Sequence, residues 1–256
     1  MRGKLTHASA ENRLLMVGIP VLVAAALVGW FMWHQTADLD DIEARTLDLA
    51  NVGYLALEHL QIVVVTAVLV VVTAVPLGIV LTRPATKFLA PLATGLANIG
   101  QAAPVIGVIV LLAIWLGFGS PVAIAGLWVY AFLPVLANVV AGLRGVDPAL
   151  VEAARGMSMS PAQVLLKVEL PMALPVIMTG VRTSLVLLVG AGAFATFIDA
   201  GGLGGLITTG INLYRNSILV SGAVLIAALA LAVEWVGRLL EVALTPKGMN
   251  ALSFAR

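Results

Sequence analysis

Long apolar stretches alternate with short polar connections along the chain, and this pattern predicts helices that cross a membrane. A helix needs about 20 apolar residues to span the roughly 30 Å of hydrocarbon in a bilayer. In lipid the backbone polar groups have to be bonded within the protein, which a helix achieves within one segment. We therefore expect an all-α, polytopic membrane protein with six transmembrane helices, at 14–34, 57–81, 92–117, 121–142, 173–198 and 217–243.

The composition agrees with this pattern and excludes several function classes. Hydrophobic residues make up 61% of the 256 residues and charged residues only 11%, whereas soluble domains carry about 25% charged residues. The mean hydropathy of +1.08 argues against a soluble enzyme, a nucleic-acid reader or a disordered partner. The chain has no cysteine, and its three histidines are too scattered in the sequence for a metal cage. We expect no cofactor and no metal in this chain.

The charges of the connections predict how the helices are oriented. Lysine and arginine gather before the first span, after the second, between the fourth and fifth, and after the sixth, whereas segment 35–56 is acidic. Positively charged connections stay on the cytoplasmic side. We therefore expect both termini in the cytoplasm. The first span lacks the small-residue cleavage pattern of a signal peptide, so we expect it to remain as a helix.

The connection between the fourth and fifth spans, at 144–171, carries helix-capping signals. Asp147 followed by Pro148 is typical of a helix start, and Gly156 is expected to end that helix.

A second short helix is predicted behind the first. Ser160 and Gln163 have the spacing of a capping box, and Pro171 is expected to stop the helix. The pattern fits either a solvated loop or a compact helix–turn–helix that exposes small residues beside the acidic Glu152. The second interpretation makes the loop a knob over which a partner's groove can close.

The residues of this loop resemble the EAA loop of ABC-importer permeases. That motif is Glu-Ala-Ala, three residues, Gly, nine residues and Ile-x-Leu-Pro, and the chain has Glu152-Ala153-Ala154 and Val168-Glu169-Leu170-Pro171 at the matching distance. Ser158 stands where the motif has glycine, and Gly156 is a candidate to supply the bend instead. The resemblance implies that the loop couples to an ATPase through Glu152, Ala153, Ala154, Gly156, Ser158, Leu170 and Pro171.

A wider resemblance covers about residues 57–245. The stretches Gly100-Gln-Ala-Ala-Pro104, Leu133-Pro-Val-Leu136 and Gly156-Met-Ser-Met-Ser160 are similar to permeases of osmoprotectant importers, in the six-span glycine betaine branch. The resemblance implies a type I ABC importer fold like that of methionine importers, in a bacterial inner membrane. It divides the chain into an N-terminal tail, first helix and acidic external segment at 1–56, a permease core at 57–245 and a cytoplasmic tail at 246–256.

The same resemblance implies the partners. These are ATPase subunits that hold ATP and Mg, an external substrate-binding protein, and a second permease subunit, identical or homologous. The chain itself has no nucleotide-binding motif. Its few aromatic residues form no dense cage for a quaternary ammonium group, so we expect the binding protein to select the solute.

Other polar, proline and glycine residues are candidates for the pathway or its gate. Within or next to spans these are Gln101, Pro104 and Asn138, with Asn98 and Tyr130 as further polar positions. The turn that contains Gly201, Gly202 and Gly204 is expected to be flexible and to bend as an outer gate closes.

Some ionisable residues lie within or at the ends of spans. Arg182 and Glu234 are expected to snorkel or to pair, and Glu58 and His59 to be solvated at the outer mouth of the second span. Two alternatives of other classes are an ion-coupled secondary transporter or channel dependent on Glu234, and an intramembrane enzyme, for which no catalytic constellation is visible. Within the ABC class, methionine, ergothioneine or another amine stays open as the substrate.

Overall fold

The structure, a computed structural model, describes residues 2–89, 91–93, 95–96 and 103–245, and every regular element in them is helical. The expected tail at 246–256 lies outside these residues. The elements are α1 (Arg2–Thr36), α2 (Asp41–Thr46), α3 (Leu49–Thr82), η1 (Lys87–Leu89), α5 (Val105–Leu116), α6 (Ser120–Arg144), α7 (Pro148–Gly156), α8 (Pro161–Val164), η2 (Leu165–Glu169), α9 (Leu170–Gly192), η3 (Ala193–Ile198), α10 (Gly204–Asn212) and α11 (Asn216–Leu244).

Five helical segments are long and apolar enough to cross a membrane, and they correspond to the first, second, fourth, fifth and sixth expected spans. They are Leu15–Thr36, Leu49–Thr82, Ser120–Arg144, Pro161–Ile198 and Asn216–Leu244. In the third stretch, expected at 92–117, α5 is a shorter apolar helix of 12 residues. Positions 94 and 97–102 of that stretch lie outside the described residues, and its described positions before 97 are helical.

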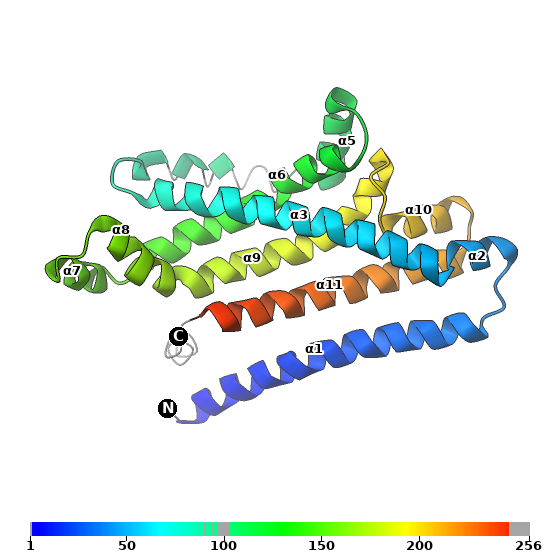
Figure 1. Ribbon diagram of the computed structural model, residues 1–256, viewed down its shortest axis with the longest axis horizontal. Coiled ribbons are helices and arrows are strands. Elements are labelled where there is room, and N and C mark those ends of the chain that lie inside the picture. The colour runs from blue at the N-terminus through cyan, green and yellow to red at the C-terminus, as the bar shows by residue number, and fades with distance from the viewer. Residues whose placement is uncertain (1, 90, 94, 97–102, 246–256) are drawn as a thin grey trace.

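The bundle is built around α9. Helices α6 and α11 pack on α9, and α3 packs on both α6 and α9 (Figure 1). Small residues bring α6 and α9 close together, because a Cβ at Gly180 would lie 2.6 Å from the Cβ of Asn138 and one at Gly142 would lie 3.1 Å from the carbonyl oxygen of Ala173. The N-terminal end of α1, the C-terminal end of α11 and the α7–α8 hairpin share one end of the bundle.

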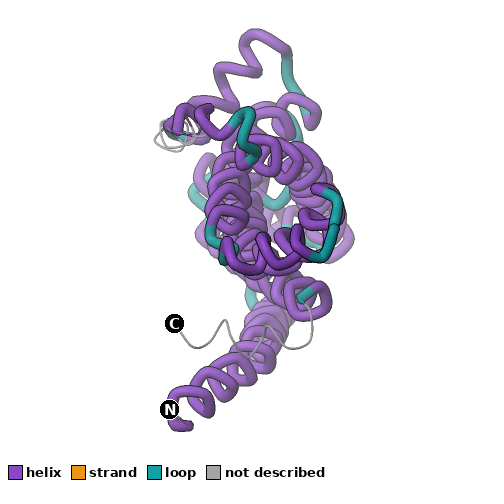
Figure 2. The backbone as a smooth tube through the Cα atoms, turned by 90° about the vertical axis from the view of Figure 1, so that its left-hand side faces the viewer, coloured by secondary structure: helices purple, strands orange, loops and turns teal. Residues whose placement is uncertain are grey.

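Helix α1 is attached to the outside of this bundle and packs mainly on α11. The Trp30 indole N–H donates to the Ser221 hydroxyl (2.9 Å), and the Trp235 indole N–H donates to the Met16 carbonyl oxygen (2.9 Å). Seen along the bundle, α1 lies at its margin and the N-terminal end projects away from the other helices (Figure 2). Most of the surface of Leu15–Thr36 within α1 is therefore left for lipid or another chain.

Two helix boundaries differ from the expected ones for local reasons. Helix α3 begins at Leu49 rather than 57, because Asp48 caps it by accepting from the N–H groups of Ala50 and Asn51 (3.0 and 3.3 Å). Pro171 does not stop a helix, since the helical path runs on into α9. The wider π-helical turn η2 directly precedes α9, and it relieves the clash that a proline makes with the carbonyl one turn before it.

Candidate functional site: the α7–α8 loop and the open face of α9

Helix α7 forms as its capping signals predict. The Asp147 carboxylate accepts from the Ala149 N–H (2.9 Å), and Pro148 occupies the first turn. Glu152 and Ala153 are exposed, whereas Ala154 is buried at 1% exposure. Glu152 makes no ion pair with any described residue. The helix therefore exposes a small acidic surface at Glu152 and Ala153, while Ala154 on its other side is packed against the protein.

The bend after α7 lies at Ser158. Gly156 is the last helical residue, and Ser158 adopts a left-handed conformation with φ 61°. The Met159 N–H donates to the Ala154 carbonyl (3.2 Å) and the Ser158 N–H to the Arg155 carbonyl (2.9 Å), which is the Schellman pattern of helix termination. The prediction that Gly156 replaces the missing motif glycine is therefore wrong: Ser158 itself takes the conformation for which glycine is favoured.

The second half of the loop is capped and tied to the bundle. The Ser160 hydroxyl accepts from the Gln163 N–H (3.3 Å) and the Gln163 side chain accepts from the Ser160 N–H (2.8 Å), which confirms the capping box. At the base, the Arg83 guanidinium at the end of α3 pairs with the Glu169 carboxylate (2.6 Å). Leu170 and Pro171 follow directly and are half-buried. Sequence reasoning missed this ion pair, which joins residues 86 positions apart.

The pathway candidates are spread over the molecule. The Asn138 amide donates to the Pro134 carbonyl (2.8 Å) and packs against Gly180 at the α6–α9 contact. Pro104 is the N-cap residue of α5. Tyr130 is half-buried on α6, and Gln101 and Asn98 lie outside the described residues.

The glycine turn at the opposite end of the bundle is closely packed, not loose as expected. Gly201 and Gly202 have φ of 79° and 88°, which glycine adopts at little cost. The Gly202 N–H donates to a carboxylate oxygen of Glu58 (3.1 Å). A Cβ at Gly204, the first residue of α10, would overlap the carbonyl oxygen of Ala193. At Gly204 the turn has no room for an added carbon.

The neighbouring His59 is buried at 1% exposure, so the expectation of solvation at an outer mouth is wrong for it. Its Nε2 lies 2.9 Å from the Val189 carbonyl oxygen, and its ring packs against Gly192 and Gly202. The difference arises because His59 lies on the side of α3 that packs against the end of α9. Together with Glu58 it clamps the glycine turn onto α3.

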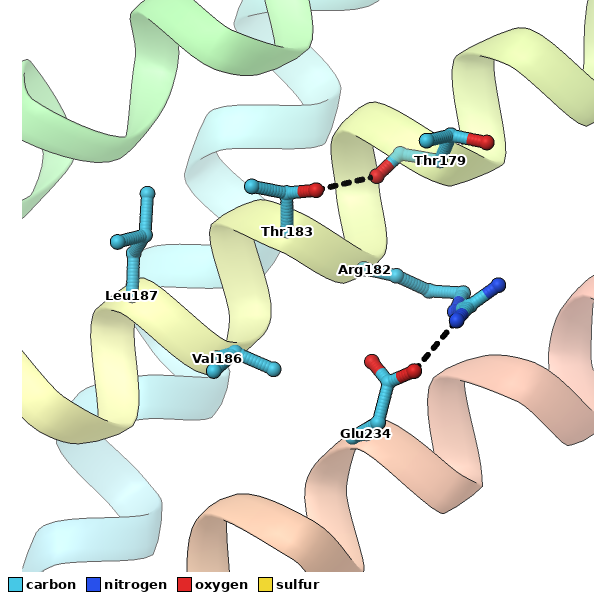
Figure 3. A pocket seen from close by; sticks show the side chains of 6 residues that line it. All are labelled: Thr179, Arg182, Thr183, Val186, Leu187 and Glu234. Atoms are coloured by element: carbon cyan, nitrogen blue, oxygen red, sulfur yellow. Dashed lines mark hydrogen bonds and ion pairs between the residues drawn. The ribbon is translucent and has the colours of Figure 1, made fainter. Parts of the chain in front are cut away.

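One face of α9 is open. Val176, Thr179, Thr183 and Val186, which recur at helical spacing, are exposed on it. The two threonine hydroxyls donate to carbonyls one turn earlier in their own helix, at 3.0 and 2.9 Å. A cavity of about 300 Å³ opens on this face, lined by Thr179, Arg182, Thr183, Val186, Leu187 and Glu234 (Figure 3).

A cluster of ion pairs borders this cavity. The Arg182 guanidinium pairs with Glu234 and, at 2.7 Å, with Glu241, and Arg238 pairs with Glu234 at 3.1 Å. The expectation that Arg182 and Glu234 pair is confirmed. Because two cations face two carboxylates, the cluster carries its charges in the membrane span without a net charge.

The chain is similar to known transport proteins over most of its length. Residues 74–245 match the family described as binding-protein-dependent transport system inner membrane component. The choline transport system permease protein OpuBB of Bacillus subtilis is 42% identical over 199 residues, which cover 78% of this chain and 91% of that protein. The glycine betaine/carnitine/choline transport system permease protein OpuCB of the same organism is 38% identical over 195 residues, covering 76% and 89%.

A solved structure agrees with these sequence matches. A chain of the MetNI methionine ABC transporter, in an inward-facing conformation, superposes with a TM-score of 0.68 at 27% identity and covers 76% of this chain and 96% of its own. The matched residues run from within α3 to the end of α11 and include the α7–α8 loop. The resemblance first indicated by the loop motif is thereby confirmed, and the chain belongs to the family of inner membrane permease components of binding-protein-dependent ABC transport systems.

Proposed function

We propose that this permease imports small trimethylammonium osmoprotectants, such as glycine betaine, choline or carnitine. The observation that carries the proposal is the similarity to OpuBB and OpuCB over about nine tenths of their lengths. The substrates that give these two relatives their names share one chemical group, a nitrogen with three methyl groups and a fixed positive charge. An external binding protein presents the solute, and the permease provides the pathway.

In this proposal the α7–α8 loop, residues 144–171, passes the conformational change of a separate ATPase to the membrane helices. ATP and Mg are held by that partner. Exposed Glu152 and Ala153 seat in a cleft of the ATPase, and Leu170 and Pro171 continue the loop into α9, so that a movement of the loop reaches the bundle. Support comes from the caps at both helix starts and the Arg83–Glu169 pair, which make the loop stiff enough to act as a lever.

The arrangement in the membrane follows from the same proposal. The loop lies at the end of the bundle where α1 begins and α11 ends, and we place this end, with both termini, in the cytoplasm. A second permease subunit, identical or homologous, covers the open face of α9. Pro104 at the start of α5 and the packed turn at Gly201, Gly202 and Gly204 then belong to the outer half of the pathway, together with Gln101, whereas Asn138 holds α6 against α9.

Purification with companions tests this function. The tagged chain is extracted in mild detergent from its native membrane, and stoichiometric partners are identified by mass spectrometry. We expect an ABC ATPase, and after reconstitution with the binding protein we expect ATP-dependent uptake of choline or glycine betaine. Uptake by the chain alone, driven by an ion gradient, would instead support a secondary transporter. Uptake of methionine but of no trimethylammonium solute would overturn the substrate assignment.

A further inference from the structure

The cavity on the open face of α9 contains one carboxylate oxygen without a partner. Both arginine contacts of Glu234 go to its Oε1, from Arg182 and from Arg238. No hydrogen bond or ion pair within the described residues involves Oε2 of Glu234. In the close view the carboxylate reaches from α11 toward α9, with one oxygen on Arg182 and the other turned away from it (Figure 3).

We propose that Glu234 is a cation-selecting residue of the transport pathway and that its free oxygen receives the quaternary ammonium group of the solute. The proposal rests on the proposed function, since it assigns a contact to the substrate class named there. It concerns a site within the permease, distinct from the solute selection by an external binding protein.

The lining of the cavity suits this chemical group. A trimethylammonium group carries a positive charge but has no hydrogen-bond donor, so it is held by charge attraction and by contact of its methyl groups. Val186 and Leu187 are apolar. The hydroxyls of Thr179 and Thr183 are occupied by their own helix. The volume of about 300 Å³ lies at the lower end of the range of small-molecule sites.

The ion-pair cluster allows Glu234 to attract a cation without binding it too tightly for release. Arg182 and Arg238 hold Glu234 in place, and Glu241 balances the charge of Arg182. An isolated carboxylate in a low-dielectric environment would bind a cation strongly. A carboxylate that already shares two guanidinium groups attracts it moderately, which suits a site that the solute has to leave again.

The absence of cysteine from the chain permits a direct test in the full-length permease, purified together with whatever partners it retains. Thr183→Cys places a single thiol in the cavity. Its reaction rates with two methanethiosulfonate reagents, one trimethylammonioethyl and one sulfonatoethyl, are each divided by the rate of the same reagent with a free thiol in solution. We expect the cationic reagent to be preferred roughly tenfold, the ratio that about 1.4 kcal/mol of charge attraction produces.

Matched variants separate Glu234 from its neighbours. Glu234→Gln in the Thr183→Cys background should reduce the preference to about twofold or less, and Glu234→Asp should restore most of it. Glu241→Gln also removes a partner of Arg182 but does not line the cavity, so it should lower the preference less than Glu234→Gln does. At Val176→Cys, on the same open face but outside the cavity lining, the preference should be small.

Two results would overturn the inference: equal normalised rates for both reagents at Thr183→Cys, or a cationic preference that survives Glu234→Gln. Neither depends on finding a transported solute. If no ATPase co-purifies, the proposed function fails by that measurement, and the reagent preference still decides whether Glu234 selects cations in this cavity. The two failures are therefore distinguishable.

Discussion

The two ends of the bundle are stabilised in opposite ways. At one end the α7–α8 loop is exposed and held by contacts between near neighbours in the sequence, such as the Asp147 cap and the Ser160–Gln163 box. At the other end the glycine turn around Gly202 is buried and held by residues more than 130 positions away, Glu58 and His59. The first end is a locally capped unit that a partner can bind, tied to α3 at its base by the Arg83–Glu169 pair, and the second end is fixed by contacts from distant parts of the bundle.

The largest loss of stability is expected from a substitution in the glycine turn, and its absence would break this comparison. Gly204→Ala forces a Cβ into the backbone carbonyl of Ala193, and we expect a loss of about 3 kcal/mol or more of stability, or no folded protein. Gly190→Ala is the matched control, because a Cβ there meets nothing within 4 Å. Thermal unfolding in detergent compares the two variants. A stable Gly204→Ala protein would show that the turn is loose after all.

A smaller effect is expected at the base of the loop. Glu169→Gln leaves the Arg83 guanidinium without its carboxylate partner, and because Arg83 is still 34% exposed at its side chain, we expect a loss of about 1–2 kcal/mol. Lys167→Gln, at an exposed position in the same π-helical turn, should change stability by less than about 0.5 kcal/mol. Equal effects of the two changes would mean that the loop does not depend on this tie to α3.

The smallest change in stability is expected at the bend after α7, and it tests whether local conformation determines the shape of the loop. Ser158→Gly relieves a non-glycine residue of its left-handed conformation, so we expect a gain of about 1 kcal/mol. Gly156→Ala should also be tolerated, since Gly156 is helical and a Cβ there meets nothing within 4 Å. The same unfolding assay checks both. Destabilisation by Gly156→Ala together with no gain from Ser158→Gly would return the bend to Gly156.

The same contrast explains what the sequence could predict. Spans are set by apolar length, and the caps of α7 and α8 are set by residues within three positions of each other, so both were predictable. The burial of His59 depends on Val189 and Gly202, and the role of Glu169 depends on Arg83. Such contacts form only when distant helices pack, and no local pattern encodes them.

The course of the chain at Pro171 is an intermediate case. The local rule that a proline ends a helix predicted a stop at Pro171. The π-helical turn before it instead lets the helical path continue into α9. The Arg182–Glu234 pair was predictable in kind, because charges within spans need partners. The cavity beside it was not, since its lining comes from the open face of α9 together with α11.

The central claim is that the α7–α8 loop couples this permease to an ATPase. The most direct measurement is ATP hydrolysis by the purified complex, with and without loaded binding protein, for Glu152→Arg and for the control Asp38→Arg, which makes the same charge change at an exposed site before α2. We predict that Glu152→Arg reduces the stimulation at least about tenfold, as expected for a charge reversed within an interface, and that Asp38→Arg preserves it. Normal stimulation in the Glu152→Arg complex would contradict the coupling role.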